Sequence, residues 1–153
     1  MFTQVIEGVL WRSSRPGYAG ERGRFVNASE VDSWLALARE HGIRSIICLL
    51  GEDQLHLYAT LPAGLIAYYR EAGFVVEHLP VLDHKSPPLS DQELELVWRA
   101  FETLPGPVVI HCSAGVDRTG SAVRHIQGRL ATEGTEVLRP DSRSSTTDGM
   151  TAR

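Results

Sequence analysis

Residues 108–120, VVIHCSAGVDRTG, decide how this chain folds. The run begins with the apolar segment Val108–Ile110, which is typical of a short buried strand. It continues through His111 and Cys112 and reaches Arg118 six positions after the cysteine, where a helix is predicted to begin. Ligands of α/β proteins bind at the carboxyl ends of strands, so this run predicts a ligand site between the strand and the helix.

The sequence on either side alternates between strand and helix patterns. Apolar, β-branched runs predict strands within residues 5–13, 43–50 and 74–79. Helices are predicted from an N-cap at Ser29 to about Gly42, in two pieces between 52 and 73, from a capping box at Ser90 to about Leu104, and from Arg118 to about Leu130. The alternation predicts an α/β fold: a single compact domain with a short, parallel-rich central sheet flanked by helices.

The composition is that of an ordinary folded protein. The chain has 153 residues, 42% of them hydrophobic, and we expect one domain over residues 1–138 and a flexible tail over 139–153, where apolar side chains are scarce. No apolar run is long enough for a membrane span, and the N-terminus lacks a signal-peptide pattern, so we expect a cytoplasmic protein. The oligomeric state is left open.

Charge and cysteine content argue against several other classes. The formal charge of −4 disfavours a general nucleic-acid binder, because such proteins need a basic surface. Cys48 and Cys112 lie far apart in unlike contexts, which indicates neither a disulfide framework nor a cysteine-based zinc site. We therefore expect no metal and no cofactor.

The loop between the strand and the helix is suited to binding an anion. Its backbone N–H groups can curl inward at a helix N-terminus, and Gly115 supplies the freedom that such a curl requires. Arg118 adds a planar fork that matches two phosphoryl oxygens. The same positive surroundings favour the thiolate form of Cys112. One loop is thus predicted to carry both a nucleophile and a phosphate site.

The run His111-Cys112-x5-Arg118-Thr119-Gly120 resembles the signature of the protein-tyrosine and dual-specificity phosphatases. Residues 8–16, GVLWRSSRP, are similar to an N-terminal segment of compact microbial members, and the resemblance extends over roughly residues 5–132. It implies a compact dual-specificity-like phosphatase that hydrolyses phosphate monoesters through a phosphocysteine, without a metal.

The resemblance also implies roles for single residues. Cys112 would attack phosphorus, Thr119 would assist departure of its thiolate in the second step, and His111 would orient the loop. The phosphate would be bound by Ser113, Ala114, Gly115, Val116, Asp117 and Arg118.

A general acid must protonate the leaving oxygen, and it should come from another loop. The resembling families place an Asp about thirty residues before the cysteine. Asp83, 29 positions upstream of Cys112, fits this spacing. Asp91 is the second candidate, but an acid in the first turn of a capped helix is explained by the helix dipole alone.

The substrate is less closely defined. Phosphotyrosine in proteins is the first expectation, and a phosphoinositide, an inositol phosphate or another small monoester is the alternative. Asp117 resembles the residue before the arginine in myotubularin-type phosphoinositide phosphatases, yet an acid there should disfavour polyanions. Ser113, Ala114 and Val116 also lack the positive charge found in enzymes for inositol phosphates. Outside this class, a phosphate-binding module without turnover and a rhodanese-like sulfur transferase remain alternatives.

Four further positions each carry two interpretations. Arg12 either braces the loop or is a surface charge, and His84 and Lys85 are either solvated loop charges or contacts for an anionic substrate. Cys48 is a core thiol or, on oxidation, the partner of Cys112 in a protective disulfide.

Overall fold

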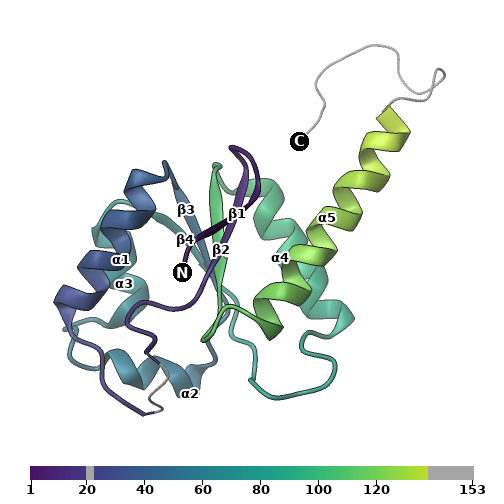
Figure 1. The fold of residues 1–153 in the computed structure, drawn as a ribbon. Helices are drawn as coiled ribbons and strands as arrows, with labels where there is room; N and C mark the ends of the chain where they lie inside the picture. The colour runs from purple at the N-terminus through teal and green to yellow at the C-terminus, as the bar shows by residue number, and fades with distance from the viewer. Residues whose placement is uncertain (20–22, 138–153) are drawn as a thin grey trace.

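The computed structural model describes residues 1–19 and 23–137 of the chain (Figure 1). The predicted tail over 139–153 and its boundary at 138 lie outside the described residues. None of the described helices is long and apolar enough to cross a membrane.

A five-stranded sheet forms the centre of the molecule. Its strands are β1 (Thr3–Ile6), β2 (Leu10–Ser13), β3 (Ser45–Cys48), β4 (Val75–His78) and β5 (Val108–His111), in the spatial order β1-β2-β5-β3-β4. β1 pairs antiparallel with β2, and all other neighbours pair in parallel. The predicted parallel-rich sheet is therefore confirmed, and β5, which leads into the signature loop, occupies its middle.

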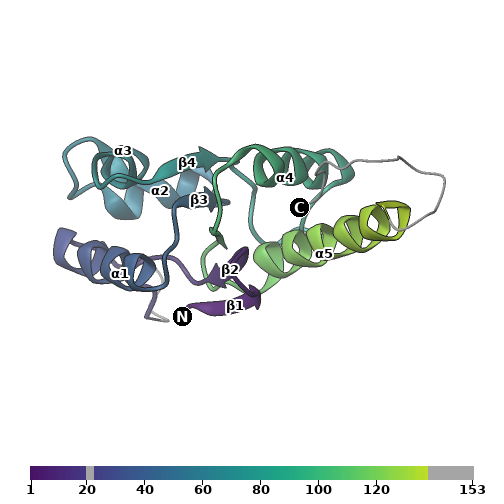
Figure 2. The same ribbon diagram turned by 90° about the horizontal axis from the view of Figure 1, so that it is seen from above.

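The helices cover both faces of the sheet (Figures 1 and 2). One face carries α1 (Ala28–Glu40), α2 (Glu52–Leu55), the 3₁₀ turn η1 (His56–Tyr58) and α3 (Gly64–Glu71), and the other carries α4 (Asp91–Thr103) and α5 (Asp117–Val137). This three-layer arrangement is the predicted compact α/β domain.

Two apolar cores follow from the alternation of side chains along the buried strands. Val109 of β5 packs into the layer of α1 and α3, whereas Val108 and Ile110 pack into the layer of α4 and α5. β3 and β5 are buried at every position. Since both faces of β5 are covered, the packing of the two cores positions its carboxyl end and the start of the loop that follows.

The start of α1 differs from the prediction. The N-cap is Asn27, not Ser29: the Asn27 side chain accepts a hydrogen bond from the Glu30 backbone, and the Glu30 carboxylate accepts one from the Asn27 backbone. Both Asn and Ser cap helices well, and Asn27 has a Glu three residues later, which completes a capping box, whereas Ser29 has an Asp there. The predicted capping box of Ser90 and Glu93 at the start of α4 is confirmed.

Candidate active site

The loop between β5 and α5 curls tightly against the end of β2. Gly115 lies at φ 80°, and a Cβ atom at this position would be 2.6 Å from the Ser13 carbonyl oxygen. Such a conformation and such a contact admit only glycine. The curl that the sequence assigned to Gly115 is therefore present, and its cause is the close approach of a second strand.

Two arginines that follow one another closely on the β2 side hold this loop. Arg12 donates through Nη2 to the carbonyl oxygens of Gly115 (2.8 Å) and Val116 (3.4 Å), which confirms the bracing interpretation. Arg15 donates through its backbone N–H to the Ser113 carbonyl (2.9 Å) and through Nε to the Ser113 hydroxyl (3.2 Å). With these carbonyls bound by β2, the amides of the loop are free to turn toward an anion.

Arg118 lies in the first turn of α5 and is almost completely buried, with 1% of its surface exposed. Nη1 donates to the carbonyl oxygens of Leu49 (3.2 Å) and Val81 (2.9 Å) and to Oε1 of Gln54 (2.9 Å). Nη2 forms an ion pair with Oδ2 of Asp83 at 3.0 Å. Nε is buried without a hydrogen-bond partner among the described residues, which leaves a charged donor available for a ligand.

Asp83 reaches the same place from the segment between β4 and α4. Besides its ion pair with Arg118, its Oδ2 accepts a hydrogen bond from Nε2 of Gln54 (3.5 Å), and its Oδ1 accepts one from the His84 backbone (2.9 Å). His84 lines the same pocket, and its Nε2 lies 3.7 Å from Oδ2 of Asp83. Asp91, the second candidate acid, lies in the first turn of α4 and does not line this pocket.

His111 forms hydrogen bonds that position the start of the loop. Its Nδ1 donates to the Cys112 carbonyl (2.9 Å), and the Tyr69 hydroxyl donates to its Nε2 (2.8 Å). A carbonyl can only accept, so the neutral ring carries its hydrogen on Nδ1. Burial lowers the pKa of His111 to about 4, and the ring is therefore neutral at physiological pH.

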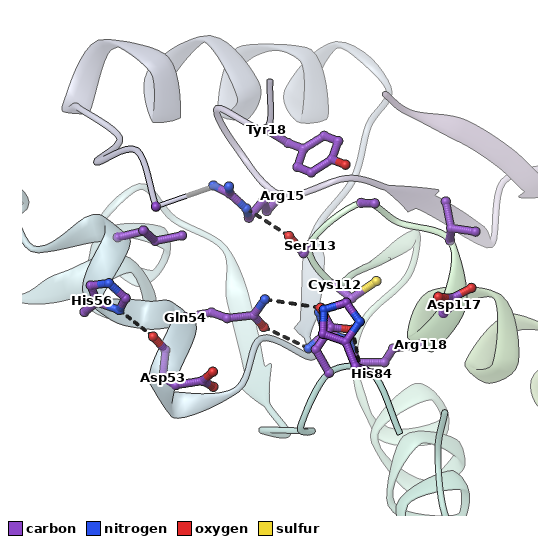
Figure 3. Close-up of a pocket in the computed structure, with 15 residues that line it drawn as sticks. Arg15, Tyr18, Asp53, Gln54, His56, His84, Cys112, Ser113, Asp117 and Arg118 are labelled. Carbon is purple, nitrogen blue, oxygen red and sulfur yellow. Dashed lines mark hydrogen bonds and ion pairs between the residues drawn. The ribbon is translucent and has the colours of Figure 1, made fainter. Parts of the chain in front are cut away.

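A cavity of about 320 Å³ joins these groups. Of the residues predicted for the site, Asp83, Cys112, Ser113, Ala114, Val116, Asp117 and Arg118 line it. The Thr119 hydroxyl is fully buried next to Arg118 in the chain and has no hydrogen-bond partner within the described part of the structure. Cys112 is 3% exposed and lies at the inner end of the pocket in Figure 3.

The sequence matches the family model described as "Polymorphic toxin system, DSP-PTPase phosphatase" over residues 21–127. The chain belongs to this phosphatase family. It is a cysteine-dependent phosphatase, as the signature predicted, and its substrates are phosphate esters. A comparison with curated proteins gives no match.

Three solved structures share the fold of this phosphatase. The core catalytic domain of the PP-IP phosphatase Siw14 from S. cerevisiae, in complex with citrate, is 19% identical with a TM-score of 0.50, over 94% of this chain and 79% of that one. A putative phosphatase (DUF442) from Shewanella putrefaciens CN-32 is 18% identical with a TM-score of 0.55, over 87% of this chain and 72% of that one. A mutant form of Tk-PTP is 22% identical with a TM-score of 0.51, over 91% of this chain and 83% of that one. At these identities the likeness concerns the fold alone.

Several residues that line the phosphatase pocket had no role in the sequence-based prediction, and two of them contact predicted site residues. Gln54, on α2, contacts both Arg118 and Asp83, and Arg15 contacts Ser113. No pattern in the sequence predicted the role of Gln54, because it lies 64 residues from the arginine that it binds. Arg15 was visible only as part of the N-terminal segment that resembles microbial phosphatases.

The structure separates the two interpretations of Lys85 and His84 but leaves that of Cys48 open. Lys85 binds Glu93 (2.6 Å) and the Pro88 carbonyl (3.0 Å) and does not line the pocket, whereas His84 does. Cys48 packs into the layer of α1 and α3 and Cys112 into the layer of α4 and α5, although Cys48 pairs in register with His111. A disulfide between the two cysteines stays a prediction.

Proposed function

We propose that this phosphatase hydrolyses phosphotyrosine in proteins, with Cys112 as nucleophile, Arg118 as phosphate-binding residue and Asp83 as general acid. One observation carries these assignments: the three side chains line a single cavity, in which Asp83 lies 3.0 Å from the guanidinium of Arg118. A nucleophile, an anion-binding group and a proton donor are the minimum set for this reaction.

In the first step the Cys112 thiolate attacks phosphorus and forms the S–P bond, while the P–O bond to the tyrosine breaks. The loop amides and the unpartnered Nε of Arg118 bind the phosphoryl oxygens. The incoming phosphoryl group displaces Asp83 from Nη2 of Arg118. The released carboxylate takes up a proton from the solvent, and this carboxylic acid gives the proton to the leaving oxygen as the P–O bond breaks.

In the second step water attacks the phosphocysteine. Asp83, now a carboxylate, takes the proton from this water, the S–P bond breaks, and inorganic phosphate and the Cys112 thiolate are formed. The Thr119 hydroxyl, buried and unpartnered in the described structure, donates a hydrogen bond to the departing sulfur. His111 keeps the Cys112 carbonyl in place throughout.

Two features of the pocket support an aryl phosphate. Tyr18 (44% exposed) and Val116 (59% exposed) both line it and offer apolar surface to a phenyl ring. The carboxylates of Asp53, Asp83 and Asp117 also line it, and they repel a ligand with many negative charges. An inositol phosphate is the second candidate substrate, since one structure of the same fold is that of a PP-IP phosphatase.

The residue roles are tested by hydrolysis of 4-nitrophenyl phosphate in the presence of EDTA between about pH 5 and 7. Cys112→Ser should abolish turnover, and Asp83→Asn should lower kcat and remove the basic limb of the pH profile. Asp91→Asn is the matched control, because this acid lies outside the pocket, and it should behave as the wild type. Turnover that survives in Cys112→Ser would overturn the mechanism.

The substrate is tested by comparing kcat/KM for a phosphotyrosine peptide, the phosphoserine peptide of the same sequence and inositol hexakisphosphate. We expect the phosphotyrosine peptide to be preferred. Preference for the inositol phosphate would move the assignment to the second candidate. Binding of orthophosphate without any turnover would indicate a phosphate-binding module, and consumption of thiosulfate would indicate a sulfur transferase.

A further inference from the structure

Arg15, which follows β2, is a buried cation in the wall of the pocket. Only 4% of its surface is exposed, yet it lines the cavity together with Cys112 and Arg118. Figure 3 shows it beside Ser113, with Tyr18 nearby. The mechanism above assigns it no role.

Among the described residues, the hydrogen-bond partners of Arg15 are neutral. Nε donates to the Ser113 hydroxyl (3.2 Å) and Nη1 to the Tyr58 hydroxyl (3.2 Å), which in turn donates to the Pro16 carbonyl (2.6 Å). The guanidinium also lies 5.5 Å from the centre of the Tyr18 ring. Within residues 1–19 and 23–137, no carboxylate is within ion-pair distance of Arg15; Glu30 interacts with it at longer range and forms its ion pair with Arg24.

Two other arginines near this pocket, Arg118 and Arg24, each have a carboxylate partner. Arg118 has the carboxylate of Asp83 at 3.0 Å, and Arg24 has that of Glu30 at 2.9 Å. A buried charge without a counter-charge is unfavourable, and an anion that arrives beside it removes the penalty. Among the described residues, the charge of Arg15 has no carboxylate in direct contact, whereas the charge of Arg118 is paired with Asp83.

In the part of the chain that the structure describes, no group accepts a hydrogen bond from Nη2 of Arg15, whereas Nε and Nη1 each have an acceptor. Nε is bound to the hydroxyl of Ser113, the residue directly after the nucleophile, so the guanidinium lies beside the loop. It is therefore placed to meet a group that neighbours the phosphate in the loop, rather than that phosphate itself.

We propose that the Arg15 guanidinium forms a second anion subsite, which takes one further oxyanion of the substrate, a carboxylate or a phosphoryl group, adjacent to the scissile phosphate. The inference rests on the proposed function and extends it to substrate selection. In a phosphotyrosine protein the second oxyanion is an acidic or phosphorylated residue next to the tyrosine. The pocket carboxylates at Asp53, Asp83 and Asp117 limit the site to one additional anion.

Three phosphonates that the enzyme cannot hydrolyse test the subsite by direct calorimetric binding, independently of turnover. Methylphosphonate carries one oxyanion, phosphonoacetate adds a carboxylate, and methylenediphosphonate adds a second phosphoryl group. The wild type should bind one or both of the two-anion ligands at least about tenfold more tightly than methylphosphonate, as one charge-assisted hydrogen bond predicts. Which of them gains affinity identifies the source of the oxyanion.

Arg15→Gln should lower the affinity for the favoured two-anion ligand at least about tenfold more than the affinity for methylphosphonate, whereas Arg15→Lys, which keeps the charge, should retain most of the gain. Arg44→Gln, an exposed arginine away from this pocket, controls for the change in net charge. Thermal unfolding of each variant confirms that it is folded. An equal loss of affinity for all three ligands in Arg15→Gln would reduce Arg15 to a brace of the loop, and a gain that survives in this variant would also refute the subsite. If the wild type did not hydrolyse phosphate esters at all, the proposed function would be refuted, and the calorimetric result on the anion subsite would remain valid.

Discussion

Replacing Gly115 by Ala should separate the loop from the strand that holds it. The glycine lies at φ 80°, in the left-handed region, and an alanine there costs about 1–2 kcal/mol. The added Cβ would lie 2.6 Å from the Ser13 carbonyl oxygen, 2.7 Å from the Ser13 carbonyl carbon and 2.8 Å from the Ser14 nitrogen. All three are backbone atoms, so no side-chain rotation can relieve the contact.

The magnitude follows from what has to move. Overpacking of this kind costs about 1–3 kcal/mol, so the free energy of unfolding should fall by about 2–5 kcal/mol in total. Movement of Gly115 away from Ser13 also stretches the 2.8 Å bond from Arg12 to the Gly115 carbonyl. Since a displacement of about 1 Å at a catalytic site can lower the rate by about 10²-fold, kcat/KM should fall by one to two orders of magnitude.

Urea unfolding and hydrolysis of 4-nitrophenyl phosphate measure the two effects. Gly128→Ala is the matched control: Gly128 lies inside α5, and a Cβ there meets nothing within 4 Å. This change should stabilise the protein by up to about 1 kcal/mol and leave kcat/KM unchanged. Wild-type activity and stability in Gly115→Ala would show that the loop does not depend on the conformation and contact described above.

Three further predictions concern groups around the loop. Burial holds the pKa of His111 at about 4, whereas histidines of the unfolded chain are protonated near pH 6.5. Because the unfolded chain therefore binds the proton first, the free energy of unfolding should fall by about 3 kcal/mol as the pH falls from 6.5 to 4. An NMR titration of the His111 ring with a midpoint near 6.5 would contradict this. Burial raises the pKa of Cys48 to about 12, so iodoacetamide at pH 8 should leave Cys48 unmodified in the folded protein, and its alkylation as fast as that of Cys112 would be the opposite result. Gln54→Leu removes the 2.9 Å acceptor of Arg118 and should lower kcat/KM by about tenfold, so unchanged kinetics would mean that Arg118 needs only its backbone and Asp83 partners.

Much of the site could be predicted because its chemistry is contiguous. A strand, a cysteine, a glycine-containing loop and an arginine at a helix start all lie within residues 108–120, and local conformational preferences decide their arrangement. Asp83 could be predicted from its distance along the chain, and the structure brings it to Arg118. The N-cap of α1 was also encoded locally, by Asn27 and Glu30, although Ser29 offered a competing signal.

The sequence by itself determined the α/β class, the family and the loop that joins β5 to α5, since each depends on residue types at short, regular spacings. Tertiary structure alone decided which residues complete the pocket. Arg15 and Ser113 are 98 positions apart, and Gln54 and Arg118 are 64 apart. Such contacts form because β2 and β3 flank β5 and end at the same edge of the sheet, and no local pattern of polar residues marks which of them will meet there.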